Sequence, residues 1–218
     1  EAMKQPKAAR RPALAKEYTE AATALLQTLD KVSTQLTAAA SHMDAVVDQL
    51  LAIKQLAWLV RDSGGQAALQ LSGAFATGRL PPEARQNYTR FITGAEFTWN
   101  ALEALVAGLQ LPPGLVEAMA AVKTGYFDPQ HLSGSEKLLN AAIAGDKLGL
   151  TSGEWRTGAV ARLGTAVTLA ERALAEAKRY TTGQWTSARR ALILDLTALV
   201  SFLALSIGSM VLVGRRAI

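Results

Sequence analysis

Arginines close to aromatic residues are the groups in this sequence that could form a ligand-binding site. A guanidinium group holds a carboxylate through two parallel hydrogen bonds, and a neighbouring ring supplies an apolar wall. The candidate ligand-binding residues, several of them near expected helix breaks, are Trp58, Arg61, Arg85, Trp99, Tyr126, Trp155 and Arg156. Each also has a structural interpretation, as a solvated arginine whose stem covers apolar surface or as an aromatic ring of the core.

The charge and composition narrow the chemistry further. With a formal net charge of +5, the chain favours an organic anion as its small-molecule ligand. There is no cysteine, and His42 and His131 lie far apart, so we expect neither a metal site nor a cofactor. We also expect no enzyme activity, because no phosphate loop, carboxylate pair or activated nucleophile stands out. The positive charges are spread along the chain, which does not indicate nucleic-acid binding.

The first long element is predicted by a heptad pattern. Apolar residues recur in alternating steps of four and three from Ala22 to Val60. A seam of this period over several heptads indicates a long helix in a coiled coil or antiparallel bundle. We expect this helix to begin near Pro12, to end at Gly64-Gly65 and to contribute to a homodimer.

Further helices are expected downstream, separated by proline and glycine. Asp128-Pro129 is expected to end one of them, and Thr151-Ser152 with Glu154 forms a start signal for the last. No alternation typical of strands is present. The expected segments are 81–108, 113–128, 135–144 and 151 onward. The sequence thus predicts an all-α fold, an elongated antiparallel helical bundle with two long helices, built as one four-helix layer or as two stacked modules.

The last helix can continue into an apolar run without meeting a proline. Residues Ala191 to Val213 carry one charge, Asp195, and a helix of this length spans roughly 34 Å, enough to cross a bilayer. Arginine pairs flank the run at both ends and leave its orientation open. We therefore expect a sensor-type domain in residues 1–188 and a transmembrane helix with the start of a cytoplasmic linker in residues 189–218.

The order of these segments resembles a known class of receptor regions. The segments that carry the resemblance are "QLLAIKQLAWLVRDSGGQAALQLSGAFATGRLPPEA", "AVKTGYF", "LTSGEWRTGA" and the terminal "GRRAI". They resemble the extracytoplasmic helical sensor regions of bacterial transmembrane receptors, and most closely those of methyl-accepting chemotaxis proteins. The resemblance implies a periplasmic domain on the inner membrane, a first membrane helix before Glu1, and a HAMP-type linker after Ile218 that feeds an output module.

Two classes of function are compatible with these observations. The first is a ligand-sensing receptor domain, of the chemotaxis type or belonging to a histidine kinase or diguanylate cyclase. The second is a membrane-anchored structural or dimerisation stalk that binds no small molecule. The irregular stretch of short helices, prolines and aromatic residues between Gly64 and Gly153 favours the sensor, because a stalk needs only continuous heptad helices.

Overall fold

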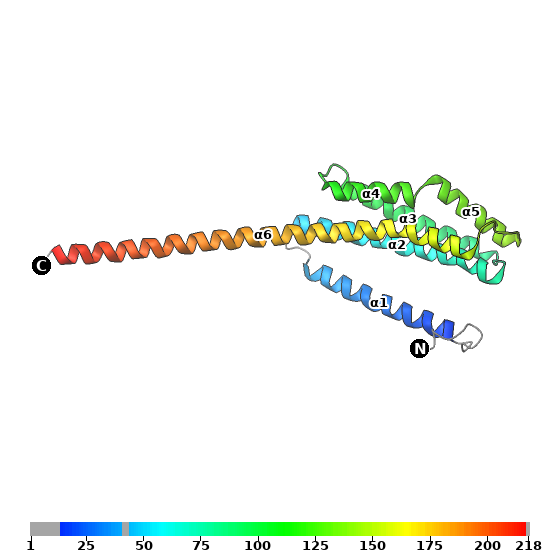
Figure 1. The fold of residues 1–218 in the computed structure, drawn as a ribbon, viewed down its shortest axis with the longest axis horizontal. Helices are drawn as coiled ribbons and strands as arrows, with labels where there is room; N and C mark the ends of the chain where they lie inside the picture. The colour runs from blue at the N-terminus through cyan, green and yellow to red at the C-terminus, as the bar shows by residue number, and fades with distance from the viewer. Residues whose placement is uncertain (1–13, 41–43, 217–218) are drawn as a thin grey trace. The chain divides into compact units, whose positions relative to one another are not determined.

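The described part of the chain is mostly helical. The computed structural model describes residues 14–40 and 44–216, with side chains at 16–39 and 44–203. Within these residues there are six helices and no strand (Figure 1), which confirms the all-α class. The helices are α1 (Leu14–Ala40), α2 (Ala45–Thr77), α3 (Glu83–Val106), α4 (Pro113–Gly125), α5 (Pro129–Ala144) and α6 (Ser152–Arg216).

The chain divides into two compact units, Glu1–Asp48 and Gln49–Ile218. The first unit contains α1, whose apolar seam is exposed at Tyr18, Leu25, Leu29, Val32 and Leu36. Farther along the predicted heptad seam, Leu50, Ile53, Ala57 and Val60 are buried within the second unit. A dimer through the long helices stays a prediction.

The prediction of one continuous helix from Pro12 to Gly64 is wrong at two points. First, α1 ends at Ala40, and α2 begins after Asp44, whose Oδ1 accepts hydrogen bonds from the backbone N–H groups of Val46 (2.8 Å) and Val47 (3.3 Å). Aspartate in this position caps the free N–H groups of a new helix. Pro12 and residues 41–43 lie outside the described residues. Second, α2 continues through both glycines to Thr77.

The second unit is an antiparallel bundle with four members. The helices α2, α3 and α6 are three of them, and α4 followed by α5 forms another, because these two short helices run one after the other in the same direction (Figure 1). The chain therefore passes up, down, up and down, with its third member interrupted. The helix α4 packs against α6.

Two apolar cores fill this bundle, one on each side of the interruption. The first core joins residues of α2, α3, α4 and α6, including Ile53, Leu102 and Leu169. The second core joins residues 67–74 of α2, the beginning of α3 and residues 138–142 of α5. Trp155, at the start of α6, packs against it. The structure thus combines the two expected arrangements, since one four-member bundle contains two stacked cores.

Short polar signals set the helix boundaries next to the interruption. The Asp128 carboxylate accepts hydrogen bonds from the backbone N–H groups of Gln130 (3.4 Å) and His131 (3.2 Å), and Pro129 occupies the first turn of α5. The motif expected to end one helix therefore also begins the next, so that α5 starts before the predicted Ser135. At the start of α6, Thr151 and Glu154 form the expected capping box.

The last helix is unbroken from Ser152 to Arg216. Its side chains from 181 to 203 are all exposed, including those of the apolar run that begins at Ala191. Among the residues whose placement is described, no helix carries an apolar stretch long enough to cross a membrane. The predicted span reaches Val213, and its side chains from residue 204 onward lie outside the described residues.

Gly64 allows a close approach that explains why the double glycine does not interrupt α2. A Cβ atom at Gly64 would lie 2.5 Å from the Tyr126 hydroxyl oxygen and 2.8 Å from Cδ2 of Leu163. At Gly65 the nearest atom is Nη1 of Arg61, at an ordinary contact distance of 3.5 Å. An interior glycine costs a helix only about 1 kcal/mol, so packing against the buried Tyr126 ring can outweigh that cost.

These adjacent glycines provide a matched pair of variants. We expect Gly64→Ala to lower the free energy of unfolding by about 1 to 3 kcal/mol, because the methyl group overlaps buried atoms that cannot easily move. Gly65→Ala should be neutral or stabilise the protein by up to about 1 kcal/mol. Urea unfolding followed by circular dichroism measures both. Equal effects of the two substitutions would contradict the packing described for Gly64.

Candidate functional site

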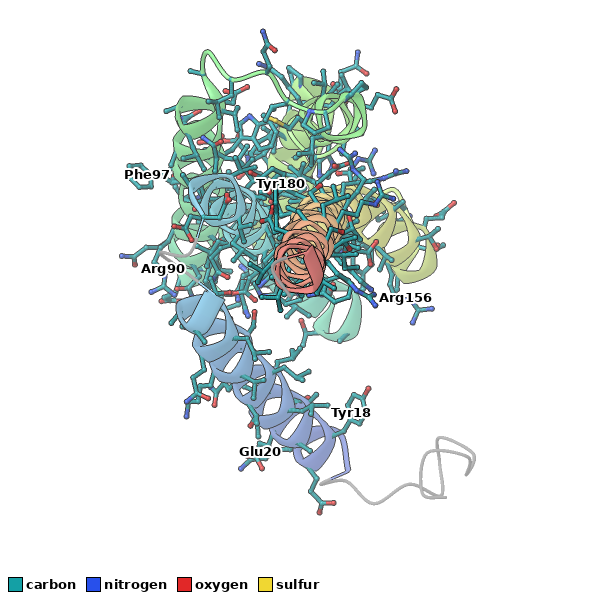
Figure 2. All side chains as sticks on the ribbon, turned by 90° about the vertical axis from the view of Figure 1, so that its left-hand side faces the viewer. Tyr18, Glu20, Arg90, Phe97, Arg156 and Tyr180 are labelled. Carbon is teal, nitrogen blue, oxygen red and sulfur yellow. The ribbon has the colours of Figure 1, made fainter. Side chains whose placement is uncertain are left out.

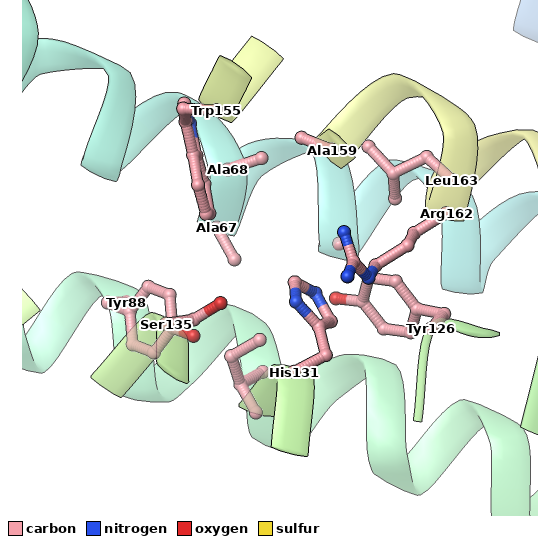
Figure 3. A pocket seen from close by; sticks show the side chains of 12 residues that line it. Ala67, Ala68, Tyr88, Tyr126, His131, Ser135, Trp155, Ala159, Arg162 and Leu163 are labelled. Carbon is pink, nitrogen blue, oxygen red and sulfur yellow. The ribbon is translucent and has the colours of Figure 1, made fainter. Parts of the chain in front are cut away.

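A small cavity lined by both apolar and polar side chains lies between the two cores, beside the interruption of the third member (Figure 3). The space open to the centre of a water-sized sphere is about 20 Å³, enough for roughly one or two water molecules. Helices α2, α3, α5 and α6 all contribute to its walls, together with Tyr126 at the end of α4. The lining residues are Gly64, Ala67, Ala68, Tyr88, Ile92, Tyr126, His131, Ser135, Trp155, Ala159, Arg162 and Leu163.

The Tyr126 hydroxyl is the least satisfied polar group of the cavity. The residue is only 4 % exposed, and its hydroxyl has no hydrogen-bond partner among the described residues. Its ring is held edge-on by Phe127, with 4.9 Å between ring centroids. Burial raises the pKa of this phenol, so the hydroxyl is protonated and can donate a hydrogen bond to an acceptor.

His131 faces the same space from the first turn of α5. Its ring lies edge-on to Tyr126, with 6.1 Å between centroids, and Figure 3 shows both pointing toward Arg162. Burial is the main reason why the pKa of His131 is lowered to about 4; the Arg162 charge lowers it further, and Asp128 opposes the shift. The imidazole is therefore neutral near pH 7, with one ring nitrogen as a donor and the other as an acceptor.

Arg162 brings a positive charge to the cavity from α6. No aspartate or glutamate is among the lining residues, and no ion pair of Arg162 is found within the described part of the chain. The nearby Asp128 carboxylate already accepts two hydrogen bonds as the cap of α5. The guanidinium group thus lacks a carboxylate partner inside the cavity.

The remaining polar groups are already paired and hold the walls in place. A side-chain hydrogen bond joins Tyr88 to Ser135, and burial raises the pKa of Tyr88. Trp155 donates from Nε1 to the Ser72 hydroxyl at 3.2 Å and stacks on Phe75. These pairs link α3 to α5 and α6 to α2, so the cavity has fixed walls.

Two of the sequence-predicted site residues, Tyr126 and Trp155, line this cavity. Trp99 is buried in the first core, where its ring packs against Phe127 at a centroid distance of 5.4 Å. The guanidinium group of Arg61 lies over the Trp58 ring on the same helix, at 5.5 Å from its centroid. These last two residues contact each other away from the cavity.

The other two predicted arginines face outward. Arg85 is exposed and lines an open groove between α3 and α5, together with Glu96 and Glu136. Arg156 is exposed at the start of α6 and points away from the bundle in Figure 2. The structure therefore does not bring the seven candidates together at one site.

Sequence reasoning missed Arg162 and His131. A usable signal was present for Arg162, because Trp155, Ala159 and Arg162 follow the spacing of one helix face. His131 lies three residues after Asp128, at the start of a helix that the sequence did not place there. Its burial depends on contacts with α6 and the end of α4, which a local pattern does not reveal.

The arrangement is suited to binding a small molecule. The cavity offers one unpaired hydroxyl donor, one cationic donor and one neutral imidazole. The described residues contain no cluster of three or more His, Cys, Asp or Glu that could hold a metal ion. These donors converge on a space of molecular size, which is how a protein holds a small acceptor-rich ligand.

The lowered pKa of His131 predicts a specific acid sensitivity. Between the ordinary value of 6.5 and about 4, the unfolded chain takes up a proton that the folded protein excludes, so stability falls as the pH falls through this window. Replacement by an uncharged residue in His131→Asn removes this contribution. Urea unfolding at several pH values should give a shallower decline for the variant, since the carboxylate titrations common to both proteins cancel. Parallel declines would contradict a half-buried, neutral His131.

Comparisons with known proteins do not add a family to this description. No protein-family model, no curated protein and no solved structure matches the chain.

Proposed function

We propose that this chain is the ligand-sensing extracytoplasmic region of a membrane-bound signal-transduction receptor of the chemotaxis type. The observation that carries the proposal is that Trp155 and Arg162, two walls of the cavity, belong to the helix that runs unbroken to Arg216. From Arg162 to the end of this helix the distance is roughly 80 Å. A ligand that contacts Arg162 can thus shift or rotate an element that extends far beyond the bundle.

The exposed second half of α6 supports membrane anchoring. Apolar side chains are exposed around the helix between residues 191 and 203, at Leu192, Ile193, Leu194, Leu196, Leu199, Val200, Phe202 and Leu203. A helix that is apolar on every side belongs in a protein core or in a bilayer. In this proposal residues 1–188 lie outside the cytoplasm, and the inner-membrane span lies within residues 189–218. An output module of the histidine kinase or diguanylate cyclase type would fit the same arrangement.

A structural or dimerisation stalk is the second candidate. It is favoured by the exposed seam of α1, where Leu25, Leu29, Val32 and Leu36 repeat with heptad spacing. Such a seam also suits the homodimer expected of a receptor. The two candidates differ in whether the bundle binds a small molecule.

A coupled binding and motion experiment separates the two candidates. Because the chain contains no cysteine, a nitroxide can be attached at one introduced thiol, Ser187→Cys on the exposed part of α6. The full 218-residue chain in nanodiscs is screened against amino acids, organic acids, nitrate and purines by thermal unfolding. We expect one ligand to raise the unfolding midpoint. At a hundredfold excess over its dissociation constant, binding adds about 2.7 kcal/mol to the free energy of unfolding.

The same ligand should change the electron paramagnetic resonance spectrum of the label at position 187. A label at the exposed Glu117 on α4 is the control for a general change of the protein. If no compound raises the midpoint, the stalk is supported and the sensor is rejected. A midpoint shift without a spectral change would contradict transmission through α6.

A further inference from the structure

The charge balance of the cavity between the two cores points to an anion. Arg162 is the only lysine, arginine, aspartate or glutamate among the lining residues. Asp128, the acid closest along the chain to His131, accepts two backbone hydrogen bonds, and Glu96 is exposed on α3. With His131 neutral, the walls carry one positive charge, and a monoanion would neutralise it.

The Tyr126 hydroxyl adds a requirement for an acceptor. A buried donor without a partner destabilises the folded protein, and an anion can accept hydrogen bonds from this hydroxyl and from Arg162 at once. A cationic ligand would meet Arg162 at close range, which disfavours it. A buried water molecule could satisfy the hydroxyl and is the competing occupant.

The size and the remaining walls limit the ligand. A space of about 20 Å³ for the centre of a water-sized sphere excludes all but the smallest ligands. Ala67, Ala68, Ala159 and Leu163 form apolar walls, and these would leave a second carboxylate without partners. The cavity is therefore matched to a small group with a single charge.

We propose that the cavity binds one small planar monoanion, a short monocarboxylate or nitrate, held by Arg162 and the Tyr126 hydroxyl with His131 as a neutral third partner. This inference rests on the proposed function, because it names the site and the ligand class of the same sensor. The three groups come from α6, from the end of α4 and from α5. An anion bound between them would connect α6 to the interrupted member of the bundle, α4 and α5.

The probes are chosen by charge, shape and size. Formate, acetate and nitrate carry the proposed chemistry, formamide and acetamide are neutral counterparts of the two carboxylates, and succinate carries a second charge. Binding to the full chain is measured by calorimetry and thermal unfolding at constant ionic strength. We expect at least one of the three small monoanions to bind, while the amides and succinate do not.

Three variants test the residues. Arg162→Gln should weaken anion binding by about tenfold to a hundredfold, as expected for loss of a charged hydrogen bond. Tyr126→Phe should weaken it by about five- to tenfold, yet leave the ligand-free protein at least as stable as the wild type, because an unsatisfied buried hydroxyl is removed. Arg172→Gln, which removes an exposed charge from the same helix, is the control and should bind as the wild type does.

The outcomes also separate this inference from the proposed function. Anion binding that is unchanged in Arg162→Gln would overturn the site. If none of the three monoanions changes the stability, a buried water is supported and the inference is overturned. A different ligand found in the wider screen would then still support the sensor. If neither the monoanions nor the wider screen gives a ligand, both proposals fail.

Discussion

The interruption of the third bundle member between Tyr126 and Pro129 is the constraint on which the rest of the second unit depends. Proline has no N–H group and is strongly disfavoured beyond the first turn of a helix, and a new helix begins after Asp128 with Pro129 in its first turn. The interruption places Tyr126 against Gly64 and separates the apolar side chains into two cores. A continuous helix here would extend one apolar face along the whole bundle, and the polar groups of the cavity would not come together.

The cavity between the two cores contains polar groups of a kind that is unusual in a protein interior. Buried polar groups are nearly always paired, yet the Tyr126 hydroxyl has no partner among the described residues, and no acid lines the cavity beside Arg162. Such a group lowers the stability of the free protein, and a ligand that pairs with it can restore that stability on binding. The helix α6 passes this cavity and continues unbroken to Arg216, so a movement of α6 on ligand binding would extend beyond the bundle.

Much of the fold could be predicted from the sequence because its boundaries are set locally. The proline pairs before α3 and α4 and the Thr151–Glu154 capping box place three helix starts correctly. Gly64 misled the prediction, since its role depends on Tyr126, which is distant in sequence. For the same reason the candidate site was only partly predictable: Tyr126 and Trp155 were expected, whereas the position of His131 depends on how α5 packs against its neighbours.

In the proposed sensor the cavity between the two cores receives the ligand, and Tyr126 can report on this binding directly. The chain has four tyrosines, so carbon-13 labelling at Cζ gives a short spectrum that Tyr126→Phe can assign. In titrations with formate, acetate and nitrate, we predict that a monoanion that binds causes a saturable shift of the Tyr126 signal, while the signals of the exposed Tyr18 and the distant Tyr180 stay constant. A ligand that binds without moving the Tyr126 signal, or that moves all four equally, would contradict it.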